Sequence, residues 1–177
     1  METIILVIPD ITFKEEAINF IEEFKKFNSN INGTGGLDRY LENYSNWLKK
    51  LDNDLDYDNI ESGRVPANTY FAITENSKNI VGMINVRHKL NDYLIEKGGH
   101  IGFGVRPKER RKGYATKILS LGINRCKELS IQEVLVTCDK DNIASAKTIQ
   151  NNGGIMENEI FDKDTNKIIQ RYWIKIE

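Results

Sequence analysis

Apolar side chains recur with a helical period over two segments in the first third of the chain. The first segment, residues 13–27, places Phe13, Ala17, Phe20, Ile21, Phe24 and Phe27 on one face. After residues 28–36 the period resumes with Leu37, Tyr40, Leu41, Tyr44, Trp47, Leu48 and Leu51. The interruption holds Gly33, Gly35 and Gly36, but no Lys follows as a phosphate loop requires. The pattern predicts two amphipathic helices joined by a plain connector.

The rest of the chain combines short apolar runs typical of strands with two further helical patterns. Strands are predicted at residues 4–8, 69–74, 79–88, 98–107, 133–138, 154–161 and 167–176, those within 69–107 as an antiparallel meander. A helix with Ala115, Ile118, Leu119, Gly122, Cys126 and Leu129 on one face follows the meander. A shorter helix over 142–152 ends at Gly153 and Gly154. Without internal repeats, 177 residues predict one domain, residues 1–177.

Charge and cysteine usage narrow the classes of function. The chain has 25 basic and 26 acidic side chains, so no global field favours nucleic acid or an anionic membrane. No apolar run approaches the roughly 18 residues that span a bilayer, and the first residues lack a basic leader. Cys126 and Cys138 show neither CxxC spacing nor nearby histidines. We therefore expect a soluble protein of the reducing cytoplasm, without a metal site.

An acidic stretch after the second helix superficially resembles a calcium loop through Asp52, Asp54 and Asp56. An EF-hand loop starting at Asp52 needs Gly at its sixth position and Glu at its twelfth, where this chain has Tyr57 and Gly63. We interpret the stretch as a solvated acidic loop, with attraction of a cationic substrate as the alternative.

The stretch "RPKERRKGYATKI", residues 106–118, gathers Lys and Arg residues between a strand and a helix. Cations are unfavourable at a helix N-terminus unless an anion binds there, so a merely solvated helix start explains them poorly. Backbone N–H groups of residues 112–115 lack intrahelical partners and can bind phosphate. Gly113 and Ala115 are small enough to admit it, and Arg110, Arg111 and Lys112 can neutralise its charge. The stretch predicts a phosphate-binding turn.

This arrangement, Arg110-x-x-Gly113-x-Ala115 between a strand and an amphipathic helix, resembles the acetyl-CoA pyrophosphate loop of the GNAT family of N-acetyltransferases. Asn142, its small-residue helix and the following Gly pair resemble the family's second cofactor-contacting segment, and the element order is similar throughout. The resemblance implies a mixed α/β (α+β) fold. Its mainly antiparallel central sheet would have about seven strands, splayed where cofactor enters, and about four flanking helices.

The resemblance also implies roles for particular residues. Backbone groups of Phe103 and Val105 would bind the pantetheine arm like an added strand. The segment Arg111, Lys112, Gly113, Tyr114, Ala115 and Thr116 would wrap the pyrophosphate of acetyl-CoA. Asn142 would bond the pantetheine or thioester region, although a helix N-cap explains that residue equally well. The family transfers the acetyl group directly to a primary amine within a ternary complex. The sequence leaves open whether this acceptor is a small molecule or a peptide.

One position departs from the family pattern. Many relatives carry a Tyr seven residues after the Asn as the acid for the departing thiolate, and this chain has Ile149. The alternative to an enzyme is therefore a degenerate acyl-CoA-binding or sensing module. Nucleic-acid binding by the basic stretch is the weaker alternative, since no aromatic stripe accompanies it. The assembly state stays open between a monomer and a homodimer.

Amine acetylation needs a group that removes the proton of the acceptor ammonium, whose pKa is about 10.4. His100, at the start of the strand that ends in the basic turn, is the candidate base because its unperturbed pKa is near 6.5. Its structural alternative is a histidine that only hydrogen-bonds the adjacent strand. His88 is the lesser candidate, and with the neighbouring Arg87 it could instead bind an acidic group on the acceptor.

Overall fold

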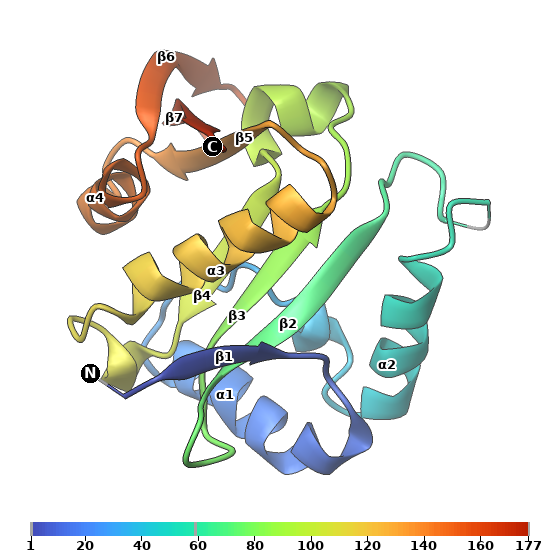
Figure 1. Ribbon diagram of the computed structural model, residues 1–177. Coiled ribbons are helices and arrows are strands. Elements are labelled where there is room, and N and C mark those ends of the chain that lie inside the picture. The colour runs from blue at the N-terminus through green and yellow to red at the C-terminus, as the bar shows by residue number, and fades with distance from the viewer. Residues whose placement is uncertain (1, 59, 177) are drawn as a thin grey trace.

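A computed structural model describes residues 2–58 and 60–176, and Figure 1 shows their arrangement. Seven strands form two antiparallel sheets. The first has the order β1 (Ile4–Val7), β2 (Ala67–Thr74), β3 (Ile80–Arg87), β4 (Ile101–Val105). The second has the order β5 (Glu133–Asp139), β7 (Lys167–Lys175), β6 (Ile155–Asp162). The mixed, mainly antiparallel fold of seven strands is confirmed, with the strands divided between two sheets.

Within the described residues four α-helices accompany the sheets, in agreement with the prediction of about four. They are α1 (Lys14–Lys26), α2 (Tyr44–Asn53), α3 (Tyr114–Glu128) and α4 (Ile143–Asn151). The second predicted helix is interrupted: a single turn η2 (Leu37–Arg39) precedes α2, which starts at a cap where Asn43 Oδ1 accepts from Asn46 N–H at 3.3 Å. Asn is a strong N-cap residue, so Asn43 starts a new helix instead of continuing the turn at η2. The other short helical segments are the 3₁₀ turns η1 (Ile11–Phe13) and η4 (Pro107–Glu109) and the π-helical turn η3 (Leu94–Gly98).

The first sheet is sandwiched between helices, with α3 on one face and α1 and α2 on the other (Figure 1). Side chains alternate along β3: Met83 packs with α1 and α2, whereas Ile84 and Val86 pack with α3. The two faces thus hold separate apolar clusters, which bury Trp47 and Phe71 on one side and Ile118 and Leu119 on the other. None of the helices in the described part of the chain has the length and apolar character needed to cross a membrane.

Candidate active site

β4 and β5 meet at a single junction beside His100. The His100 N–H donates to the Leu135 carbonyl oxygen at 2.7 Å, and the Leu135 N–H donates to His100 Nδ1 at 3.0 Å. Beyond this junction the two strands belong to different sheets. The imidazole therefore ties together the two sheets at the point from which they diverge.

The surroundings of His100 favour its structural alternative. Its side chain is 7% exposed, and burial, helped by the charge of Arg87, lowers the pKa of His100 to about 4. The expected pKa near 6.5 is therefore corrected to a lower value. Because Nδ1 accepts a backbone N–H, the proton of the neutral ring lies on Nε2, which leaves no free lone pair for a base at neutral pH. The catalytic role of His100 stays a prediction.

His88, the lesser candidate, has both ring nitrogens engaged. Nδ1 lies 3.0 Å from Tyr57 Oη and Nε2 lies 2.6 Å from Asn68 Oδ1. The Asn68 oxygen can only accept, so Nε2 carries the proton and Nδ1 accepts from the Tyr57 hydroxyl. Burial lowers the pKa of His88. Its ring is held as a neutral hydrogen-bonding group.

The outer edge of β4 carries backbone groups that no strand uses. Arg87 N–H donates to the His100 carbonyl oxygen at 2.8 Å, which sets the even-numbered residues of β4 as those that bond β3. Odd-numbered residues, including Phe103 and Val105, turn their N–H and C=O groups to the opposite edge. Within the described chain β4 is the last strand of its sheet, so no strand covers this edge, although the Val105 carbonyl oxygen already accepts from Arg110 Nε at 3.2 Å.

The turn that follows β4 has a backbone suited to an anion. Arg111 (φ 62°) and Gly113 (φ 80°) both adopt the left-handed conformation. Turns of this kind can gather N–H groups into a concave anion-binding cluster. No described side chain caps the start of α3 at Tyr114, so the N–H groups of its first turn, as far as Thr116, face outward. The fit to a pyrophosphate rests on this backbone.

The basic side chains of the turn have different surroundings. Arg110 is drawn back onto the protein: Nε donates to the Val105 carbonyl oxygen at 3.2 Å, and Nη2 donates to Ser29 Oγ at 2.7 Å. Lys112 pairs with Glu109 at 2.8 Å on the surface, and Arg111 is exposed. Arg111 and Lys112 are therefore the side chains that can reach a phosphate, while Arg110 braces the turn.

The remaining predicted cofactor residues lie around α3 and α4. Tyr114 is buried in the core, and Ala115 packs against it. Asn152 Nδ2 donates to the Thr116 carbonyl oxygen at 3.2 Å, which joins the two helices. Asn142 caps α4, its Oδ1 accepting from Ser145 N–H at 3.1 Å, so its amide NH2 remains for another partner. Ile149 is fully buried, as expected of a packing residue.

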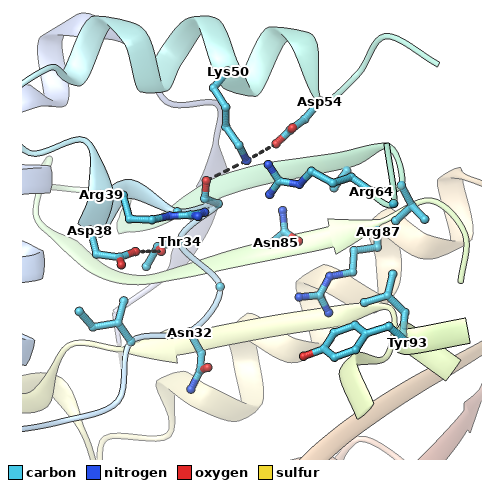
Figure 2. A pocket seen from close by; sticks show the side chains of 18 of the residues that line it. Asn32, Thr34, Asp38, Arg39, Lys50, Asp54, Arg64, Asn85, Arg87 and Tyr93 are labelled. Carbon is cyan, nitrogen blue, oxygen red and sulfur yellow. Dashed lines mark hydrogen bonds and ion pairs between the residues drawn. The ribbon is translucent and has the colours of Figure 1, made fainter. Parts of the chain in front are cut away.

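A pocket of about 550 Å³ opens on the α1 and α2 face of the first sheet (Figure 2). Its floor includes Ala67, Asn85 and Arg87 from β2 and β3. Its walls come from the connector, η2, α2, residues 63–65, and Asn91, Tyr93 and Leu94. Gly33 packs so tightly on β4 that a Cβ there would lie 2.5 Å from the Gly102 carbonyl oxygen. The connector predicted as plain therefore shapes a pocket wall beside β4.

Charged groups dominate this pocket. Lys50 Nζ donates to the Gly35 carbonyl oxygen at 2.9 Å and forms an ion pair with Asp54, which is 7% exposed. The prediction of a solvated acidic loop is therefore wrong at Asp54, although Asp52 and Asp56 are exposed. Asn85 donates to Thr69 Oγ1 at 3.0 Å, and none of the described residues donates to its Oδ1.

Sequence reasoning missed most of this pocket. Arg39, Lys50 and Arg64 lie in segments that carried no motif, and only Arg87 had been considered for an acidic group on the acceptor. The three glycines of the connector were the available signal, since Gly33, Gly35 and Gly36 all have positive φ values. No group of three or more His, Cys, Asp or Glu side chains within residues 2–58 and 60–176 could hold a metal ion.

Residues 22–155 match the family model of the acetyltransferase (GNAT) domain, which covers more than half of the chain. None of the curated protein sequences matches the chain. Solved structures with the same fold include RimL, a ribosomal alpha-N-protein acetyltransferase in complex with coenzyme A. It is 15% identical, with a TM-score of 0.70 over 98% of this chain and 94% of that one.

Two further structures extend the comparison. The microcin C7 self-immunity acetyltransferase MccE, in complex with acetyl-CoA and AMP, is 17% identical with a TM-score of 0.67, covering 98% of this chain and 92% of that one. A GNAT acetyltransferase from Bacillus anthracis is 18% identical with a TM-score of 0.65, covering 98% and 95%. At these identities the structures establish the shared fold.

Proposed function

The chain belongs to the GNAT family of acetyl-CoA-dependent N-acetyltransferases, and we propose that it transfers the acetyl group directly to a primary amine bound in the pocket over β2 and β3. One observation carries the proposal: the open edge of β4 leads into an uncapped, left-handed turn, and the pocket borders the same strand. We take residues 1–177 as one acetyltransferase domain.

The cofactor side of this proposal is mainly backbone. Phe103 and Val105 would bond the pantetheine arm along the β4 edge, and the turn from Arg111 to Thr116 would hold the pyrophosphate. The family implies a contact from the Asn142 amide to the same ligand. The support is the set of N–H groups that the described protein leaves without partners at the start of α3.

In the proposed reaction the neutral amine nitrogen attacks the thioester carbonyl carbon. A C–N bond forms and the C–S bond breaks, and the CoA thiolate leaves and takes up, directly or through water, the second proton that the nitrogen loses as it becomes an amide. The pocket assists because its lining includes Arg39, Lys50, Arg64 and Arg87, against the carboxylates of Asp38 and Asp54. Nearby positive charge lowers the pKa of an ammonium group. The acceptor therefore loses its proton more readily, and water takes that proton without a protein base.

Thiol release tests this function directly. Acetyl-CoA is incubated with a panel of primary amines, and free CoA is measured together with the acetylated product. We expect amine-dependent thiol release at a rate well above hydrolysis. Ile149, which cannot donate a proton, favours the alternative of a degenerate acyl-CoA-binding module. Binding of acetyl-CoA without thiol release for any amine would select that alternative.

The compartment is part of the proposal. Cys126 and Cys138 are both buried and free, and burial raises the pKa of each thiol, to about 12 and about 11. A raised thiol pKa disfavours the reactive thiolate, so neither is placed to act as a nucleophile. We propose that the protein works in the reducing cytoplasm on a small-molecule or peptide amine.

A further inference from the structure

Three guanidinium groups from distant parts of the chain face the same pocket. Arg39 lies in the turn η2, Arg64 in the loop before β2, and Arg87 at the end of β3 (Figure 2). We call these residues the arginine triad. Within residues 2–58 and 60–176, neither Arg39 nor Arg87 forms an ion pair, and Arg64 has only the exposed Glu61 at 3.4 Å. Arg39 and Arg64 are exposed, so water solvates their charge until a ligand replaces it.

Arg87 is fixed in position by neutral groups. Its Nη1 donates to the Gly98 and Gly99 carbonyl oxygens at 2.7 and 2.9 Å. Burial lowers the pKa of Arg87, Tyr93 opposes this shift, and the charge of Arg64 acts in the same direction as burial. A partly buried guanidinium held this way costs free energy unless an anion compensates it. The protein therefore maintains a preorganised cation at the pocket floor.

The other pocket charges repel one another as well. Burial lowers the pKa of Lys50, Asp54 opposes this, and Arg64 and Arg39 lower the pKa further. Both arginines are thus close enough to Lys50 to destabilise its charge. The Asp54 carboxylate is already paired with Lys50, and Asp38 accepts from Thr34 Oγ1 at 3.4 Å. Cations converge here without enough carboxylates to balance them.

We propose that the arginine triad is an anion subsite that binds a carboxylate or phosphate group of the acceptor. This inference rests on the proposed acetyl transfer and narrows it to amines that also carry an acidic group. Arginine suits the role because its planar guanidinium forms paired hydrogen bonds with carboxylate and phosphate oxygens. A polyamine, which carries only positive charge, would be repelled by the arginine triad and by Lys50.

Matched acceptors test the class of substrate. Thiol release is compared for each amino acid against its amide, for phosphoethanolamine against ethanolamine, and for spermidine. We expect kcat/KM to be at least tenfold higher for the acidic member of one pair, and the responding pair identifies carboxylate or phosphate as the group bound. Equal or faster turnover of the amides, ethanolamine or spermidine would overturn the inference.

Anion binding is tested separately from activity. With the cofactor turn saturated by CoA, inorganic phosphate should raise the melting temperature of the parent by mass action. The double variant Arg39→Gln/Arg64→Gln should lose this rise and show at least a tenfold higher KM for an acidic acceptor. Lys26→Gln/Lys49→Gln removes two exposed charges outside the pocket and should retain the rise.

The two readouts separate the two proposals. A phosphate response that survives in Arg39→Gln/Arg64→Gln, or no response in the parent, overturns the arginine triad as an anion subsite whatever the turnover. A response that depends on the triad, without thiol release from any amine, supports the anion subsite and instead refutes acetyl transfer. Arg39 and Arg64 are both exposed, so the double variant should remain folded.

Discussion

The two ligand sites that we propose beside β4 draw on different parts of the chain. On the cofactor side, consecutive residues from Phe103 to Thr116 present backbone groups along a strand edge, a turn and a helix start. On the acceptor side, Arg39, Arg64 and Arg87 bring side chains together from separate segments. The first arrangement uses backbone groups of residues that are consecutive in sequence. The second uses side chains that are far apart in sequence and meet only in the folded chain.

If both proposed sites hold, this difference would let one fold keep its cofactor and vary its acceptor. Backbone N–H groups at a helix start bind phosphate whatever side chains surround them, provided that the turn can adopt its left-handed residues. The pocket has no such constraint, because loops and helix ends supply its walls. Substitutions at the turn should therefore abolish cofactor binding, whereas those in the pocket should alter acceptor choice.

The largest effect is expected from Gly113→Val, which changes the backbone of the proposed cofactor turn. A β-branched residue at φ 80° is strained, and its Cβ would fill the space left for a phosphate. We expect the acetyl-CoA-dependent rise in melting temperature to disappear, while the unliganded protein loses about 1–3 kcal/mol. The measurement is a thermal melt with and without acetyl-CoA.

Gly63→Val is the matched control for Gly113→Val. Gly63 has φ +81°, and a Cβ there would meet nothing within 4 Å, so the backbone strain is the same without a new contact. Gly63 lines the acceptor pocket, and its variant should still bind acetyl-CoA. If Gly113→Val bound acetyl-CoA as well as the parent, the turn would not be the cofactor site.

The same difference determines what sequence could predict. The strands, the helices and the turn at Gly113 follow from periodicity and from adjacent residues, and their order was confirmed. The sequence did not predict that the strands divide into two sheets. Where β4 and β5 part depends on the hydrogen bonds between His100 and Leu135, which are 35 positions apart. The burial of Asp54 was missed for a similar reason: its charge is tolerated only because Lys50 lies beside it in the folded pocket.

His100 joins the two sheets at the start of β4, and its substitution tests whether this junction or a catalytic base is its role. His100→Ala leaves the Leu135 N–H without an acceptor and loosens the junction of the sheets, so we expect acetylation to slow by at least about 100-fold. His100→Asn supplies an Oδ1 that can accept the same N–H but cannot act as a base. We expect Asn to restore most of the activity in a thiol-release assay.

The opposite outcome would assign His100 a catalytic role. If Asn were as slow as Ala while both variants bound acetyl-CoA normally, and the acidic limb of the kcat/KM profile disappeared, the imidazole would be the base despite its engaged Nδ1. The proposed mechanism, in which water takes the proton of the acceptor, would then be replaced by one in which His100 takes it.

The pH dependence of stability examines the same junction without turnover. The folded pKa of His100, about 4, lies below the unfolded value of about 6.5, so acid protonates the unfolded state first. The contribution of His100 to the free energy of unfolding is fully present above about pH 6.5. As the pH falls towards 4, about 3 kcal/mol of it is lost. Burial of His88 acts in the same direction. Denaturant unfolding from pH 7 to pH 4 measures the loss, and His100→Asn should flatten it. An equal slope in that variant would place the titration elsewhere.

The smallest effect is expected at Asn142. Its amide would add a side-chain contact to a cofactor site that otherwise consists mainly of backbone groups. Its Oδ1 caps α4 through Ser145 N–H, so Asn142→Ala should cost about 1 kcal/mol and lower the melting temperature by about 2–4 °C. Asn142→Asp keeps an oxygen for the cap but removes the amide donors. If those donors bind acetyl-CoA, the Asp variant should melt like the parent and bind the cofactor several-fold more weakly in a calorimetric titration. Unchanged affinity in the Asp variant would make Asn142 a cap alone, and the cofactor side would then depend on backbone groups and the two exposed cations of the turn.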